Sequence, residues 1–183
     1  KETIQGSTEV IIAIPVQSGL QTVIVNLKPK GGKLIEKQGT AIGKSQIDWK
    51  VQVNKSLDKI KHAVITDVMP DGLELIEDSV KLYHLQVNGD GSTVLGAEVD
   101  SGKYTILTSD GKKLELAFQD EAISKAYELR FSTKLTGEQE RFENTAVLSG
   151  EGMEDSRATA TVTVQRGQFL EKSYNQDSET GII

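Results

Sequence analysis

A two-residue alternation of apolar and polar side chains runs through most of this chain and limits what it can fold into. Such alternation is typical of β-strands that bury one face and expose the other to water. Four stretches show it, with these apolar-face residues: IDWKVQVN (Ile47, Trp49, Val51, Val53), KKLELAF (Leu114, Leu116, Phe118), AYELRFSTKL (Tyr127, Leu129, Phe131, Thr133) and RATATVTV (Ala158, Ala160, Val162, Val164). The alternation predicts a protein made largely of half-buried strands.

Turn sequences separate these strands. VNGDGST at 87–93 and SDGKK at 109–113 predict β-hairpins, and MPDGL at 69–73 predicts a tight turn. One helical pattern, QDEAISKA at 119–126, predicts at most a short crossover helix. Many short strands with regular turns predict an all-β fold, an immunoglobulin-like or jelly-roll β-sandwich. We expect five large side chains in its core: Trp49, Phe118, Leu129, Phe131 and Phe142.

Composition excludes several classes of function. The chain has 183 residues, a net charge of −6 and no basic stripe, which argues against contact with nucleic acid or an anionic membrane. The absence of cysteine removes disulfides, thiolate metal sites and cysteine nucleophiles. The two histidines, His62 and His84, are too few for a metal site, and Ser149 lacks a readable His–Asp arrangement. We therefore expect no metal, no cofactor and no turnover enzyme.

A short repeat suggests how the chain is organised. KLIEKQG at 33–39 is echoed by QFLEKSY at 168–174, so that Glu36–Lys37 aligns with Glu171–Lys172. A fixed offset of this kind favours a tandem array, of which this chain would be a part. We expect residues 31–166 to form a complete β-sandwich and residues 167–183 to be the first strand of a following repeat. Residues 1–30 would be terminal strands of a preceding module or extra strands of the main domain.

Three polar residues fall on apolar strand faces. Lys37 shares a face with Ile35, Asp67 with Ala63 and Ile65, and Asn144 with Phe142 and Ala146. Each has an ordinary explanation: an edge-strand lysine that reaches water, a strand-end aspartate in a turn, an asparagine that satisfies the backbone. Together they suit one reaction. Burial favours a neutral, nucleophilic amine and a protonated acid, which could join the amine to the carboxamide with loss of ammonia.

The same residues carry a family resemblance. Lys37 in EKQG, Trp49 in IDWKVQVN, Asp67 in ITDVMPDGL, Tyr127 in YELRFSTKL and Asn144 in FENTAVL resemble the landmarks of isopeptide-forming, collagen-adhesin-type domains of Gram-positive surface proteins. The resemblance covers roughly residues 33–165. It implies that Lys37 and Asn144 form an intramolecular isopeptide bond, with Asp67 as proton shuttle and Trp49 as a core marker. Lys172 would be the corresponding lysine of the next module.

The resemblance leaves two functions open. The first is a structural stalk module of a bacterial cell-surface adhesin, extracellular and attached to the cell wall, with adjacent modules of the same polypeptide as partners. The alternative is a module that binds a host extracellular-matrix protein, collagen being the family's namesake ligand. Tandem repetition favours the stalk, whereas a broad groove lined with apolar and aromatic side chains would favour the binding module. The opposing explanation for the three polar residues is an ordinary buried ion pair of Lys37 and Asp67 beside a hydrogen-bonded Asn144.

Overall fold

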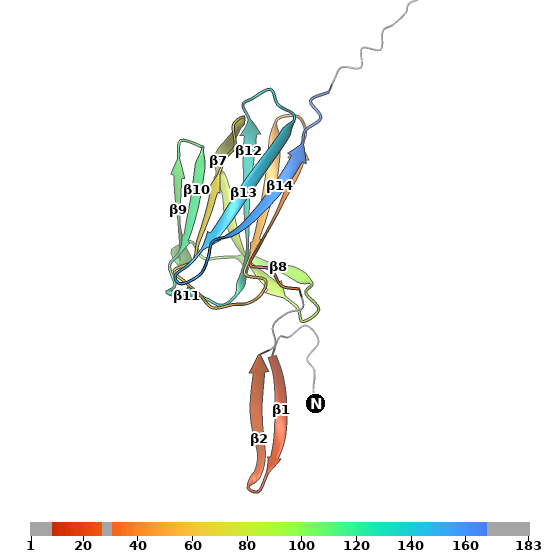
Figure 1. Ribbon diagram of the computed structural model, residues 1–183, viewed down its shortest axis with the longest axis vertical. Coiled ribbons are helices and arrows are strands. Elements are labelled where there is room, and N and C mark those ends of the chain that lie inside the picture. Colours follow the sequence, from red (N-terminus) through yellow and green to blue (C-terminus); the bar gives the residue numbers. More distant parts are fainter. Residues whose placement is uncertain (1–8, 27–30, 168–183) are drawn as a thin grey trace, which may run out of the picture.

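Two five-stranded antiparallel sheets face one another in a sandwich (Figure 1). The computed structural model describes residues 9–26 and 31–167. We call the sheets the β3 sheet and the β14 sheet, after one edge strand of each. The β3 sheet has the order β3 (Ile35–Ile42), β4 (Gln46–Val53), β12 (Ala126–Leu135), β7 (Leu73–Val87), β8 (Thr93–Glu98). The β14 sheet has the order β14 (Ser156–Thr163), β13 (Arg141–Ser149), β6 (Val64–Val68), β10 (Lys113–Phe118), β9 (Tyr104–Ser109). The predicted all-β sandwich is confirmed.

The predicted turns are also confirmed. β7 and β8 form a hairpin around 88–92, and β9 pairs with β10 around Asp110 and Gly111. Both of these turn residues have positive φ, 48° and 66°, which glycine and aspartate tolerate better than most residues. The MPDGL turn joins β6 to β7, and the Leu73 amide donates to the Pro70 carbonyl at 3.1 Å.

The two sheets approach each other along β3 and β14. Each of these edge strands has one hydrogen-bonded neighbour, β4 and β13 respectively, and the two strands contact each other across the sandwich. The chain therefore brings an early and a late strand together at one side of the core. This contact positions the site described below.

The core is the one predicted from the alternation. Trp49 is 1% exposed, Phe131 and Phe142 are 2% exposed, and Leu129 is fully buried. Phe118 is also buried. Because register is set by which face is buried, these burials confirm the strand faces on which the site prediction depends.

The helix predicted at 119–126 is wrong. That segment contains β11 (Ala122–Ile123), which pairs with β5 (Ile60–Lys61). The helix that the described residues do contain is one 3₁₀ turn, η1 (Ser101–Lys103), capped by the Asp100 side chain. A helix of eight residues is marginal in water, so the backbone pairing offered by β5 decides the conformation. No helix among 9–26 and 31–167 is long and apolar enough to span a membrane.

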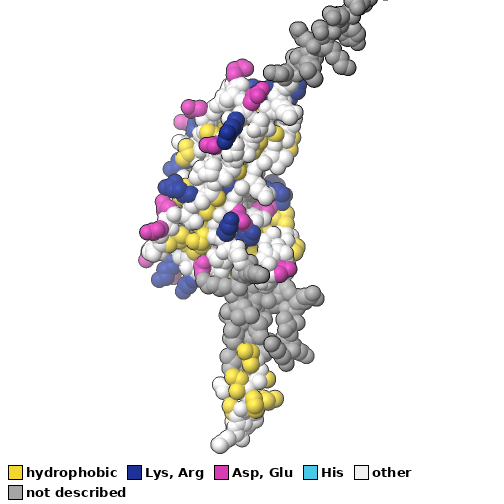
Figure 2. All heavy atoms as spheres, turned by 45° about the vertical axis from the view of Figure 1, so that its right-hand side comes forward, with side chains coloured by type: hydrophobic (Ala, Val, Ile, Leu, Met, Phe, Trp, Pro, Cys, Tyr) yellow, Lys and Arg dark blue, Asp and Glu magenta, His cyan; other side chains and the backbone are white. Residues whose placement is uncertain are grey.

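An N-terminal hairpin, β1 (Glu9–Val16) and β2 (Gly19–Asn26), forms a two-stranded sheet of its own. Apolar side chains are prominent on it in Figure 2, and Leu20 at its turn is 75% exposed. Its assignment to a preceding module stays a prediction. The repeat predicted for 167–183 falls, from residue 168 on, outside the described residues.

Asn54 links the loop after β4 to the loop before β12 by hydrogen bonds of its side chain. Its side chain is fully buried, donates to the carbonyls of Asp58 (2.8 Å) and Lys125 (3.0 Å), and accepts from the Asp58 amide (3.0 Å). Its φ of 59° is a left-handed backbone conformation, which asparagine adopts more readily than most residues other than glycine.

We expect Asn54→Ala to lower the free energy of unfolding by about 2 to 4 kcal/mol, since it loses three partly buried hydrogen bonds and strains the backbone. Urea denaturation measures the change. Asn54→Gly removes the same hydrogen bonds but tolerates the positive φ, so its free energy of unfolding should be about 1 kcal/mol higher than that of Asn54→Ala. Equal stability of all three proteins would contradict this role for Asn54.

Candidate functional site

The three polar residues on apolar faces meet inside the sandwich. Lys37 lies on β3, opposite Val51 of β4, and points inward like its neighbour Ile35. Asp67 lies on β6, opposite Ala146 of β13. Asn144 precedes Ala146 by two residues and therefore faces the core from the strand next to Asp67. The amine thus comes from one sheet, and the carboxyl and the carboxamide come from the other.

Lys37 and Asp67 form a direct contact between the sheets. The Lys37 amine donates a hydrogen bond to Asp67 Oδ2, and both side chains are 0% exposed. The interpretation of Lys37 as an edge-strand lysine that reaches water is therefore wrong, although β3 is an edge strand. Asp67 as a turn residue is wrong for the same reason, because its carboxyl lies in the core.

Aromatic rings enclose the amine. Lys37 Nζ lies 4.9 Å from the centroid of the Trp49 ring and 5.1 Å from that of Phe131. The indole is fixed in turn, since Trp49 Nε1 donates to Thr133 Oγ1 at 3.0 Å. Gly39 makes room for it, because a Cβ there would lie 2.5 Å from the indole.

This burial changes the protonation equilibria of both groups. It lowers the pKa of the Lys37 amine below its usual value, although the neighbouring Asp67 carboxyl opposes the change. Burial likewise raises the pKa of Asp67, against the opposing influence of Lys37. Both shifts favour the uncharged pair, a neutral amine beside a protonated acid.

Asn144 is the unusual member of the cluster. A weak hydrogen-bonding interaction of its carboxamide with Asp67 is the last and smallest of the influences that lower the carboxyl pKa. Even so, neither Oδ1 nor Nδ2 of Asn144 meets the geometry of a hydrogen bond with any described residue, and neither does Asp67 Oδ1. The interpretation of Asn144 as a hydrogen-bonded core asparagine therefore depends on Asp67 alone, through a contact outside the usual hydrogen-bond geometry. Buried polar atoms without partners cost about 1 to 3 kcal/mol each, so this cluster is poorly explained as packing alone.

Sequence reasoning identified the three polar residues and missed what surrounds them. Thr133 was placed on the inward face but not paired with Trp49. Gly39 was not singled out, although a glycine inside a strand often marks a close approach of another group. Lys172, predicted for a following module, lies outside the described residues.

Comparison with known proteins places the fold. The family model of the collagen binding domain matches residues 32–159. The collagen-binding subdomain of the Enterococcus faecalis surface protein ACE is 19% identical, with a TM-score of 0.55 over 72% of this chain and 97% of that one.

Two further structures resemble this chain. The collagen-binding domain of a Staphylococcus aureus adhesin is 15% identical, with a TM-score of 0.54 over 73% of this chain and 99% of its own. The collagen-binding domain of the Erysipelothrix rhusiopathiae surface protein RspB is 14% identical, with a TM-score of 0.51 over 89% and 62% of the two chains. At these identities the structures show a shared fold. A search of curated protein sequences finds no match.

Proposed function

The chain belongs to the collagen-binding domain family, and on that premise we propose that it is a structural module of a bacterial surface adhesin, locked by a Lys37–Asn144 isopeptide bond. The module would lie outside a Gram-positive cell, in a protein attached to the cell wall, with adjacent modules of the same polypeptide on either side. The observation that carries the proposal is the sealed cluster of Lys37, Asp67 and Asn144. Its amine and acid favour their neutral forms, and its carboxamide has no hydrogen-bond partner among the described residues.

The proposed reaction balances without a cofactor. The neutral Lys37 Nζ attacks Cγ of Asn144 while the protonated Asp67 donates a hydrogen bond to the amide oxygen. Asp67 then accepts a proton from the attacking nitrogen and delivers one to the departing Nδ2, which leaves as ammonia. The new bond joins Nζ to Cγ, and Asp67 is protonated again at the end. The step occurs once per molecule, so the module is not a turnover enzyme.

The position of the bond suits a module that bears tension. It would join β3 of one sheet to β13 of the other and close a loop of about 107 residues. Strands within this loop could not be pulled apart without breaking a covalent bond. A chain without cysteine would thereby gain the kind of cross-link that a disulfide provides elsewhere.

Intact mass tests the proposal. Folded wild-type chain should be about 17 Da lighter than its sequence, because ammonia is lost. Lys37→Met and Asn144→Leu keep the approximate side-chain volume but cannot react, so each should carry its full calculated mass. Lys50→Met, at an exposed position of β4, is the matched control and should still show the loss. A folded wild-type chain of full mass would overturn the proposal.

Binding of an extracellular-matrix protein is a second candidate, favoured by the family match and by relatives described as collagen-binding domains. Ion pairs occupy the outward face of the β3 sheet, for example Arg130–Glu128 (2.6 Å) and Lys134–Glu74 (2.9 Å). Tyr83 on the same face lies under Arg130, 5.3 Å from its guanidinium carbon. These charged side chains argue against an aromatic-lined groove on this face. Solid-phase binding of the chain to a panel of matrix proteins, collagen included, separates the two functions.

A further inference from the structure

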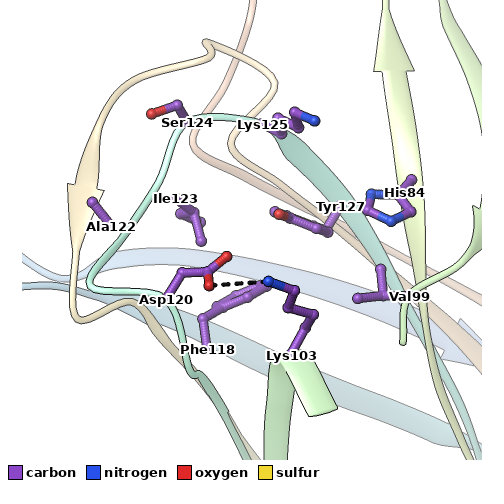
Figure 3. Close-up of a pocket in the computed structure, with 10 residues that line it drawn as sticks. All are labelled: His84, Val99, Lys103, Phe118, Asp120, Ala122, Ile123, Ser124, Lys125 and Tyr127. Atoms are coloured by element: carbon purple, nitrogen blue, oxygen red, sulfur yellow. Dashed lines mark hydrogen bonds and ion pairs between the residues drawn. The ribbon is translucent and has the colours of Figure 1, made fainter. Parts of the chain in front are cut away.

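A separate cavity of about 320 Å³ opens between the sheets, near the β5–β11 pair (Figure 3). It shares no residue with the Lys37 cluster. β7, β10, β11, β12 and η1, with the loops beside them, supply its lining: His84, Val99, Lys103, Phe118, Asp120, Ala122, Ile123, Ser124, Lys125 and Tyr127.

Aromatic and aliphatic side chains form the interior of the cavity. The Tyr127 ring lies between two others, with centroid distances of 4.8 Å to Phe118 and 5.6 Å to His84. Ile123 and Val99 complete the apolar surface, and both are buried. A hollow of this size and lining suits one apolar side chain of a ligand.

One hydrogen-bond donor, the Tyr127 hydroxyl, faces the hollow, and a cation, Lys125, lies at its edge. The Tyr127 hydroxyl points into the hollow in Figure 3. Burial, with a contribution from Asp120, raises the pKa of Tyr127, so that the hydroxyl keeps its proton and remains a donor at neutral pH. Lys125 at the rim has no ion-pair partner within the described part of the chain.

The charge of the rim opposes that of the protein. The chain carries a net charge of −6, yet the lining holds two lysines and one aspartate. The Lys103–Asp120 pair at 3.5 Å is more than half exposed on both sides, and such pairs contribute little. Among the residues that the structure describes, Lys125 has no ion-pair partner, and its position beside an apolar hollow favours a ligand that carries an anion next to an apolar group.

The rim is built before any ligand arrives. Asn54 Nδ2 donates to the Lys125 carbonyl at 3.0 Å, and the Gln119 amide donates to the Lys103 carbonyl at 2.9 Å. A preformed site avoids part of the ordering cost of binding.

A second hollow, of about 490 Å³, shares two residues with the first, His84 and Lys125. Leu57, Leu85, Gly96 and Ala126 line its other side. The apolar residues that line it belong to a cluster separate from the main core, so the second hollow lies beside the first and does not extend it.

We propose that this end of the sandwich binds an acidic peptide segment of a partner protein. An apolar side chain would occupy the hollow beside Phe118 and Tyr127, and an adjacent carboxylate would accept hydrogen bonds from Lys125 Nζ and the Tyr127 hydroxyl. The proposal stands independently of the isopeptide bond.

Amide chemical shifts of the full 183-residue chain, followed by NMR, test this site. The probe is the capped dipeptide acetyl-Leu-Asp-amide. Its isosteric neutral analogue acetyl-Leu-Asn-amide and the apolar-group control acetyl-Gly-Asp-amide complete the set. We expect saturable shifts at 118–127 with a dissociation constant on the order of 1 mM, as suits a small ligand. Both controls should bind about tenfold more weakly.

Variants assign the donors. Lys125→Ala and Tyr127→Phe should each weaken binding of acetyl-Leu-Asp-amide by about five- to tenfold. Tyr127→Phe keeps the ring and its packing, so it separates the hydroxyl from the fold. Lys113→Ala, on β10 but outside the cavity lining, should bind like wild type. Equal affinity for the Asp and Asn peptides, shifts that map elsewhere, or no saturation at ~20 mM would overturn the proposal.

Discussion

Asn144→Leu is expected to lower the melting temperature of the folded chain by about 10 to 20 °C, the largest stability effect we predict. By the chain-entropy estimate, a cross-link across a loop of about 107 residues is worth roughly 4 to 5 kcal/mol. Leucine fills nearly the same volume as asparagine but cannot be joined to Lys37. Differential scanning calorimetry of the two proteins, with intact mass recorded on the same samples, measures the effect.

The leucine substitution also separates the bond from its packing. It removes two buried polar atoms that have no partner among the described residues, and without a cross-link this change should be neutral or stabilising. A large loss of stability in Asn144→Leu therefore reports the covalent bond. Lys37→Met should melt near the same temperature, and Lys50→Met should melt like wild type. An Asn144→Leu protein as stable as wild type would show that no cross-link stabilises the fold.

Asp67→Asn is expected to slow formation of the bond by about 10²- to 10⁴-fold, the range that a positioned acid–base group contributes. The amide preserves the shape of the carboxyl but can neither donate its proton to the departing nitrogen nor accept one from Lys37. The unfolded 183-residue chain, first confirmed to have its full calculated mass, is refolded and sampled by mass spectrometry over time. A wild-type rate in Asp67→Asn would remove Asp67 from the mechanism and leave it a structural partner of Lys37.

The pH dependence of the same rate follows from the two pKa shifts. The reactive pair holds one proton, on Asp67, and its amine is neutral. At low pH the pair takes up a second proton, Lys37 becomes charged and the rate falls. Because the pKa of Lys37 is lowered, this fall occurs at a pH below the usual lysine range. At high pH Asp67 loses its proton and the rate falls again. Because the pKa of Asp67 is raised, this second fall occurs at a pH above the usual carboxyl range. We expect a rate that is level between these limits and falls on both sides of them. A rate that rises continuously with pH would indicate an amine that acts without the acid.

The alternation of side chains by itself determined the strand faces. Trp49, Phe131 and Phe142 lie in the core as predicted, and so do Lys37, Asp67 and Asn144. This worked because the pleat of a strand repeats every two residues whatever its neighbours are. The turns at 88–92 and 110–111 were equally readable, since positive φ restricts the residues that can occupy them.

The segment at 119–126 shows where local pattern was insufficient. Its apolar spacing predicts a helix, but β5 offers Ala122 and Ile123 a hydrogen-bonded partner from a distant part of the chain. The indole of Trp49 is a second case, because its hydrogen bond to Thr133 joins residues 84 positions apart. Neither contact can be predicted from the local sequence.

The inward direction of the three polar residues could thus be predicted from the sequence. Their partners could not: the contact of the Lys37 amine with Asp67, the enclosure of this amine by Trp49 and Phe131, and the poor hydrogen-bond geometry of Asn144 appear only in the folded chain. The direction of a side chain could be predicted because it depends on backbone geometry within one strand. Its neighbours in the core depend on how two sheets pack and on which edge strands, here β3 and β14, they bring together.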